Sequence, residues 1–253
     1  MTILPRLDIG AGEPTLTFVH GFTQTKISWL PIATTMAVHH RCVLLDAPHH
    51  GEAQSLDIGF ADAADLVSQT ATNSVLVGYS MGGRLALAAT LHGSSQLRAL
   101  VLVSSTAGIE SDEERRGRRQ TDERLADHIE SIGTSAFLDE WTAQPMFSGT
   151  NIAPEDLAGR LSNSPRALSQ SLRKCGTGVQ PSYWGELSEI TIPTLIVVGE
   201  RDSKFREIGK RLNDQIRGSE FIVVTNAGHA VHLDQPEAFI AALEDFVARR
   251  VSS

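Results

Sequence analysis

The stretch Ser74-Val-Leu-Val-Gly78-Tyr79-Ser80-Met81-Gly82-Gly83 decides the fold. An apolar segment of strand type leads directly into Gly-x-Ser-x-Gly, and a helix-forming composition begins at Arg84. This context predicts a sharp strand-to-helix turn that lifts the Ser80 hydroxyl above a sheet as a nucleophile. Glycines at 78 and 82 fit such a turn because side chains there would clash. The alternative is an ordinary turn with an incidental serine.

Short apolar segments alternate with helical patterns along most of the chain. The expected strands are 15–20, 41–46, 74–79, 97–104, 194–199 and 220–225. The expected helices are 27–38, 60–71, 82–92, 204–217 and 235–250. Nearly continuous apolar strands are typical of parallel sheets covered by helices on both faces. The pattern therefore predicts one α/β domain over residues 1–253, with a mostly parallel sheet flanked by helices.

The alternation stops between residues 108 and 185, where no convincing strand is found. A charged helical pattern covers 112–132, and the aromatic residues Phe137, Trp141 and Phe147 follow it. We interpret residues 108–185 as a helical cap insertion that covers the ends of the strands. The alternative is an ordinary run of sheet-covering helices.

Composition and charge limit the possible function classes. The 253 residues are 41% hydrophobic and 21% charged, with a formal net charge of -8, which argues against general nucleic-acid binding. Cys42 and Cys175 form no Cys-x-x-Cys pair, which argues against a zinc site. No apolar run has the length of a membrane span, and no signal-peptide pattern begins the chain. We expect a cytoplasmic monomer or small homo-oligomer without metal or cofactor.

A histidine is needed to polarise a serine nucleophile. His229 follows the strand at 220–225 through the turn Asn226-Ala-Gly228, which places it at the same sheet edge as Ser80. His232 lies three residues further on and is interpreted as a packing residue, with direct ligand contact as the alternative.

The acid that orients this imidazole should also follow a strand. Asp202 follows the strand at 194–199 and is the preferred candidate, with Glu200 as the alternative. The chain order Ser80, Asp202, His229 is the order found in α/β hydrolases. The three residues are therefore predicted to form a catalytic triad.

An oxyanion hole is expected from two backbone N–H groups. The strand Thr15-Leu-Thr-Phe-Val-His20 ends in Gly21-Phe22. In this fold one donor follows the nucleophile and the other comes from an early strand–helix loop. The N–H groups of Met81 and Phe22 fit these roles, and His20 is interpreted as a structural residue.

With these residues, nearly the whole chain resembles the α/β-hydrolase superfamily. Asp46-Ala-Pro-His-His-Gly51 is similar to the family's Asp-x-Pro-Gly-His-Gly turn, but has His49 where glycine is usual. A narrower resemblance is to the 2-succinyl-6-hydroxy-2,4-cyclohexadiene-1-carboxylate synthases of menaquinone biosynthesis. The segments that carry it are 78–84, 115–122, 141–147, 176–181 and Gly199-Glu-Arg-Asp-Ser-Lys-Phe205.

The narrower resemblance implies a lyase that expels pyruvate from a small substrate with three carboxylates. Arginine is suited to such a ligand because its guanidinium binds a carboxylate with two parallel hydrogen bonds. The resemblance favours Arg118, Arg84 lies one turn after Ser80, and Arg160 is a third candidate. Tyr79 and Trp141 are expected to line the pocket. The other arginines of the charged run are interpreted as a solvated helix face: Arg115, Arg116 and Arg119.

Two other function classes remain open on the residues alone. A serine hydrolase acting on an ester, thioester or carbon–carbon bond of a small acidic substrate would use the same three residues. A non-catalytic ligand-binding protein is the other class, and it would have no need of all three.

Overall fold

A seven-stranded sheet forms the centre of the molecule, and its strands lie in the order β1-β3-β2-β4-β5-β6-β7. The computed structural model describes residues 3–93 and 96–251. All neighbouring strands are parallel except β1, which pairs antiparallel with β3. The strands are β1 (Arg6–Ile9), β2 (Leu16–Val19), β3 (Cys42–Leu45), β4 (Val75–Tyr79), β5 (Ala99–Val103), β6 (Thr194–Gly199) and β7 (Glu220–Val224).

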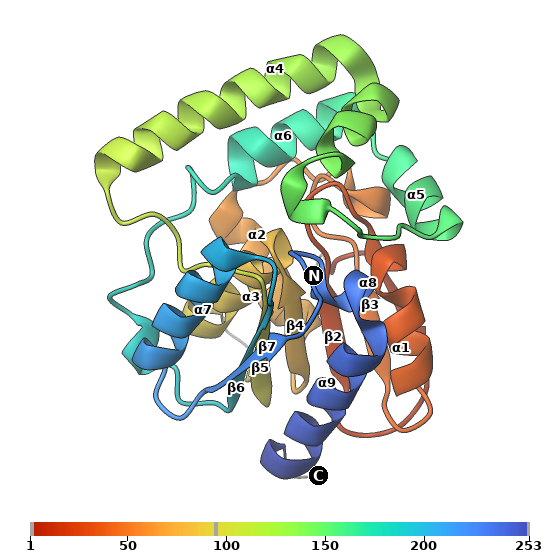
Figure 1. Ribbon diagram of the computed structural model, residues 1–253, viewed down its shortest axis with the longest axis vertical. Helices are drawn as coiled ribbons and strands as arrows, with labels where there is room; N and C mark the ends of the chain where they lie inside the picture. The colour runs from red at the N-terminus through yellow and green to blue at the C-terminus, as the bar shows by residue number, and fades with distance from the viewer. Residues whose placement is uncertain (1–2, 94–95, 252–253) are drawn as a thin grey trace.

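Helices cover both faces of this sheet, as Figure 1 shows. One apolar core lies between the sheet and α2 (Phe60–Thr70), α3 (Met81–His92) and α7 (Ser203–Gln215). The other lies against α1 (Leu30–Met36) and α9 (Pro236–Arg250). The remaining short helices are η1 (Lys26–Trp29), η2 (Gly51–Ala53), η3 (Pro145–Phe147), η4 (Leu187–Glu189) and α8 (Val231–Asp234). None of the helices in the described ranges is long and apolar enough to cross a membrane.

The predicted α/β-hydrolase architecture is confirmed, and one strand is additional. The six predicted strands all occur, and β6 has the predicted bounds of 194–199. The sequence pattern does not predict β1, a four-residue edge strand with alternately exposed and half-buried residues. Such a strand lacks the continuous apolar run that marks strands buried on both faces.

The helical cap insertion is also confirmed. It contains α4 (Asp112–Thr142), α5 (Pro154–Leu161) and α6 (Pro165–Cys175), and α4 crosses above α6 and the sheet in Figure 1. The helical path of α4 breaks at Gly133, whose φ is 81°, directly after the predicted end at residue 132. Positive φ is accessible to glycine at little cost. A small apolar cluster, including Ile129 and Leu168, holds α4 to α6.

The turn between β4 and α3 is sterically closed to larger residues. Ser80 has φ 50° and ψ -107°. A Cβ at Gly78 would lie 2.5 Å from the Gly82 carbonyl oxygen. A Cβ at Gly82 would lie 2.6 Å from the carbonyl oxygen of His20 and would also meet that of Val19. The first turn of α3 can therefore press against the end of β2 only because residue 82 is glycine.

The Gly82→Ala substitution is expected to destabilise the protein by roughly 1–3 kcal/mol, because rigid backbone atoms must move to admit the methyl group. The matched control is Gly117→Ala in α4, where an added Cβ meets nothing within 4 Å. That change is expected to stabilise the fold by about 0.5–1 kcal/mol. Urea unfolding measures both, and equal stability of the two variants would contradict the steric account.

Candidate active site

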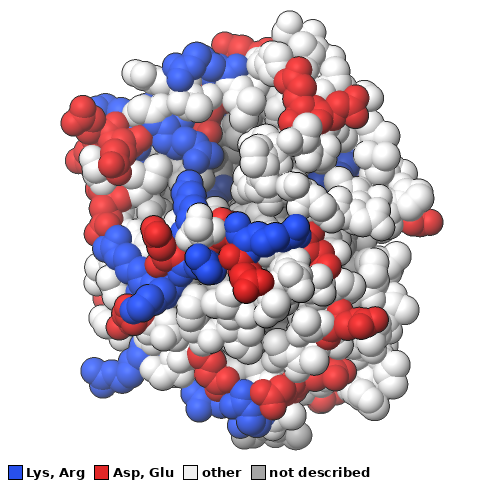
Figure 2. Space-filling view, in the orientation of Figure 1, with Lys and Arg blue, Asp and Glu red and all other residues white. Residues whose placement is uncertain are grey.

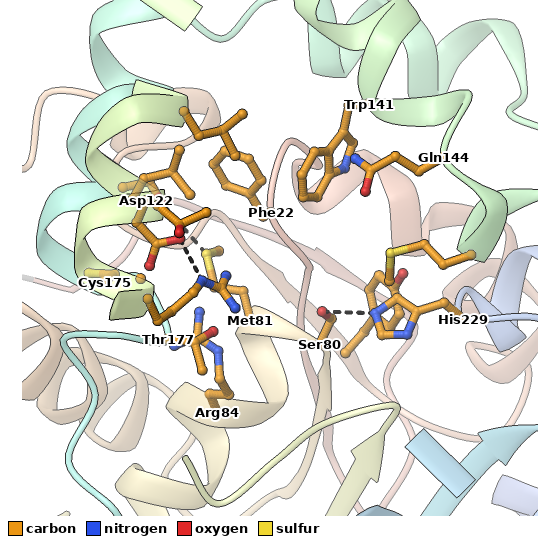
Figure 3. Close-up of a pocket in the computed structure, with 18 of the residues that line it drawn as sticks. Phe22, Ser80, Met81, Arg84, Asp122, Trp141, Gln144, Cys175, Thr177 and His229 are labelled. Atoms are coloured by element: carbon orange, nitrogen blue, oxygen red, sulfur yellow. Dashed lines mark hydrogen bonds and ion pairs between the residues drawn. The ribbon is translucent and has the colours of Figure 1, made fainter. Parts of the chain in front are cut away.

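A continuous chain of hydrogen bonds joins Ser80, His229 and Asp202. The imidazole Nδ1 of His229 lies 2.7 Å from Asp202 Oδ2. Its Nε2 lies 3.1 Å from Ser80 Oγ, and Figure 3 shows these two side chains facing each other. A carboxylate accepts only, so Nδ1 donates to it and Nε2 is left to accept the serine proton. Three loops far apart in sequence thus meet at one edge of the sheet.

Asp202 and Glu200 have different surroundings, although they lie two residues apart. Asp202 is the residue in contact with His229, and its Oδ1 accepts a hydrogen bond from Phe205 N–H at 3.2 Å. Glu200 is exposed, and its Oε2 accepts from Asn226 N–H at 2.9 Å. Glu200 therefore bridges two loops and does not contact the imidazole.

Phe22, in the loop after β2, and Met81 carry the two N–H groups predicted to form an oxyanion hole. Phe22 and Met81 both line the cavity above the serine, and within the described residues no loop or turn hydrogen bond uses either N–H. His20 supports this loop: its Nδ1 donates to the Gly21 carbonyl at 2.8 Å, and its Nε2 accepts from Ala47 N–H at 3.1 Å. Burial lowers the pKa of His20, so the neutral form that both bonds require is favoured.

His49 occupies a glycine-like position in the turn after β3. Its φ is 68°, in the left-handed region that favours glycine. The backbone at His49 therefore adopts the left-handed conformation that favours glycine, although a histidine side chain is present. The His49 Nε2 is 2.9 Å from the Ile58 carbonyl oxygen, which ties the side chain to the following loop.

His232 is buried away from the serine. It stacks on Trp29 with ring centroids 4.2 Å apart and packs against Tyr79 at 4.5 Å. Neither ring nitrogen has a hydrogen-bond partner among the described residues. Burial lowers its pKa to about 3, so the ring is neutral at ordinary pH and packs as an aromatic residue.

The Ser80 hydroxyl opens into a cavity of about 350 Å³ between the sheet and the cap. Figure 3 shows Phe22 and Trp141 above Ser80, and Arg84, Asp122 and Thr177 on the side away from His229. Further lining residues are Tyr79, Met81, Arg118, Thr121, Leu125, Gln144, Met146, Phe147, Ser171, Leu172, Cys175, Gly176, Lys204 and Phe205. In the described part of the chain, no group of three or more His, Cys, Asp or Glu residues could hold a metal ion.

One end of the cavity is positively charged. Arg118 pairs with Asp122 through its Nε at 2.7 Å, whereas buried Arg84 has no carboxylate partner among the described residues. Burial and then the nearby charge of Arg118 lower the pKa of Arg84 to about 10. Figure 2 shows Lys and Arg side chains gathered beside a hollow on this face. Lys204 is exposed and also lines the cavity.

Four of the five predicted substrate-binding residues line the cavity: Tyr79, Arg84, Arg118 and Trp141. Arg160 does not, so the structure does not place it where a substrate-binding residue was expected. Its guanidinium donates to Asp156 Oδ2 through Nε at 3.1 Å and Nη2 at 2.9 Å. A third contact reaches Thr23 Oγ1 at 3.3 Å. The buried ion pair lies within α5, and the Thr23 contact joins this helix to the loop after β2, so the guanidinium is already occupied. The four-residue spacing of Asp156 and Arg160 permits this pair on one helix, but Arg118 and Asp122 have the same spacing and line the cavity.

Three residues near the site are not among those that the sequence predicts for it. Lys204 carries a third positive charge at the cavity, and Phe205 packs on His229 with centroids 4.5 Å apart. Both belong to the Ser-Lys-Phe string that follows Asp202, so strand-end placement could have indicated them. Gln180 contacts Arg84 from a position 96 residues away, which no local pattern indicates.

Comparison with known proteins identifies a family and named relatives. A sequence profile described as the alpha/beta hydrolase family matches residues 18–242. A Bacillus subtilis (strain 168) protein is 36% identical over 243 residues, covering 90% of this chain and 88% of the relative. It carries the name 2-succinyl-6-hydroxy-2,4-cyclohexadiene-1-carboxylate synthase provisionally. The enzyme of that name from Escherichia coli O157:H7 (strain EC4115 / EHEC) is 31% identical, covering 92% and 93%.

Solved structures agree with the fold. MenH from S. aureus superposes with a TM-score of 0.91 at 29% identity, covering 99% of each chain. A thermophilic esterase from Thermogutta terrifontis gives a TM-score of 0.80 at 24% identity, covering 98% of this chain and 94% of the esterase. The esterase likeness is one of fold alone.

The Asp202→Asn substitution is expected to slow labelling of Ser80 by a fluorophosphonate by about 100-fold or more, because the amide favours the wrong imidazole tautomer. Glu200→Gln is the matched control and should label at nearly the original rate. Mass spectrometry of the labelled protein measures both rates. A larger loss in the Glu200 variant would assign the orienting role to Glu200 instead.

Proposed function

The chain belongs to the α/β-hydrolase family, and we propose that it is a carbon–oxygen lyase acting on a small polycarboxylate. The reaction would eliminate pyruvate from 2-succinyl-5-enolpyruvyl-6-hydroxy-3-cyclohexene-1-carboxylate. The product would be 2-succinyl-6-hydroxy-2,4-cyclohexadiene-1-carboxylate, the compound that the names of two relatives contain.

The observation that carries this proposal is the positive charge at one end of the cavity. Arg84 is buried with no carboxylate partner in the described chain, and Arg118 lies close enough to lower its pKa. Two neighbouring guanidinium groups favour a bound anion when, among the described residues, Asp122 is the one carboxylate that pairs with either of them. A substrate with several carboxylates fits that charge, whereas a neutral ester would leave Arg84 uncompensated.

Ser80, His229 and Asp202 would supply the proton transfer. Asp202 holds Nδ1 of His229, so that Nε2 can take the Ser80 proton. The serine oxygen would then remove the proton next to the succinyl ketone. The electron pair moves into the ring as the carbon–oxygen bond to the enolpyruvyl group breaks. The released enolpyruvate takes up a proton and becomes pyruvate.

The N–H groups of Phe22 and Met81 would stabilise the enolate oxygen that develops in this step. An oxyanion hole acts on developing negative charge, whether on a tetrahedral intermediate or on an enolate. No acyl-enzyme is then needed. Trp141 and Phe22, whose ring centroids are 5.3 Å apart, line the cavity above the serine and would limit the access of water to it. This arrangement favours elimination over hydrolysis, the second use of the same residues.

Purified protein is expected to accelerate pyruvate release from the enolpyruvyl substrate well above the spontaneous rate, with the diene chromophore appearing in step. Ser80→Ala should reduce this rate by about 100-fold or more, because the transferring oxygen is lost. Lactate dehydrogenase coupling measures pyruvate, and absorbance measures the diene. Spontaneous rates with the wild-type protein, together with rapid ester turnover, would favour the serine hydrolase.

Arg118→Ala is expected to raise KM or lower kcat so that kcat/KM falls by roughly 10- to 100-fold, since a charge-assisted hydrogen bond contributes about 1.5–3 kcal/mol. Arg116→Ala is the matched control, because Arg116 is exposed on the same helix and outside the cavity lining. Steady-state kinetics of the two variants measure the difference. Similar kinetics would assign Arg118 to the solvated face of α4.

A further inference from the structure

Gln180 is the partner that the structure gives to the buried guanidinium of Arg84. Nη1 of Arg84 donates to Gln180 Oε1 at 3.2 Å, and both side chains are buried. Gln180 lies outside the cavity lining, whereas Arg84 lies within it. The amide therefore contacts the guanidinium from the side that faces away from the cavity. A ligand in the cavity could contact Arg84 but not Gln180.

This contact fixes the amide and leaves its NH2 group without an acceptor. Arg84 can only donate, so the amide oxygen must face it. Gln180 Nε2 is then buried with no hydrogen-bond partner among the described residues. A buried donor without an acceptor lowers stability. Gln180 therefore occupies its position at a local cost that the fold does not explain.

The nearby arginine is held in a different way. Arg118 pairs with a carboxylate, that of Asp122, whose second oxygen accepts from Gly178 N–H at 3.4 Å. Asp122 thus compensates Arg118 while Gln180 leaves the charge of Arg84 intact. The two arginines share one cavity but present unequal net charge to it.

We propose that Gln180 is a positioning residue that orients Arg84 through a neutral acceptor and so reserves its full charge for a carboxylate of the bound ligand. This inference deepens the anionic-substrate class of the proposed function and rests on it for the biological ligand. A glutamate at 180 would be the better local partner, since it is nearly isosteric, would form a charge-assisted bond and would remove the unused donor. It would also neutralise Arg84 before any ligand arrives.

The test compares Q180E with Q180M in the full-length protein. Isothermal titration calorimetry with tricarballylate, a simple tricarboxylate, measures anion affinity, and thermal unfolding without ligand measures stability. We expect Q180E to keep or raise Tm and to bind tricarballylate about 10- to 100-fold more weakly, the effect of losing a charge-assisted hydrogen bond. Q180M should lower Tm because it removes the acceptor, but should lose less affinity because the charge of Arg84 remains.

Q180E should be the more stable variant but the weaker binder, and Q180M the less stable variant but the tighter binder. A merely structural role of Gln180 would not separate stability from affinity in this way. The inference is overturned if Q180E binds tricarballylate as tightly as the wild type, or if Q180M loses as much affinity as Q180E. It is also overturned if Q180E does not fold, or if the wild type does not bind the probe. Pyruvate release by the wild type tests the proposed lyase separately, because calorimetry with tricarballylate requires no turnover.

Discussion

The close approach of α3 to the end of β2 is the constraint on which the site depends. Backbone carbonyls of Val19 and His20 occupy the space that a side chain at residue 82 would need. This contact brings the loop that carries Phe22 up to the turn that carries Ser80 and Met81. It also directs the first turn of α3 toward the cavity, so that Arg84, bonded through its N–H to the Ser80 carbonyl at 3.1 Å, lines the same space as the serine hydroxyl.

The local sequence pattern predicts the continuously apolar strands and the turns that follow them. Parallel strands end at a common edge of the sheet. The proximity of residues directly after them, such as Asp202 and His229, can therefore be predicted without knowledge of side-chain packing. The edge strand β1 escapes this reasoning because half of its residues face solvent. The predicted helical pattern ends at residue 132, directly before the break in α4 at Gly133, but the continuation of the helix to Thr142 is set by packing against α6.

The cavity charges could be predicted only in part, because a charged residue's function depends on which partner it finds. Arg160 and Arg118 each lie four residues from an acidic residue on the same helix. The first pair is buried within α5, while both residues of the second line the cavity. Sequence spacing is identical in the two cases, so burial and orientation decide. Gln180, distant in the chain and uncharged, has no local signature at all.

The residues proposed for proton transfer and oxyanion stabilisation lie at the sheet edge, whereas the positive charge proposed to select a ligand comes largely from α3 and the cap. Ser80, His229 and two N–H groups are equally suited to acyl transfer and to enolate formation. The choice between them depends on which bond the bound ligand places beside Ser80. A carboxylate anchored at Arg84, as proposed, would fix that position from one turn of helix away. Charge at the far end of the cavity can thus determine the reaction without any change in the residues that move the proton.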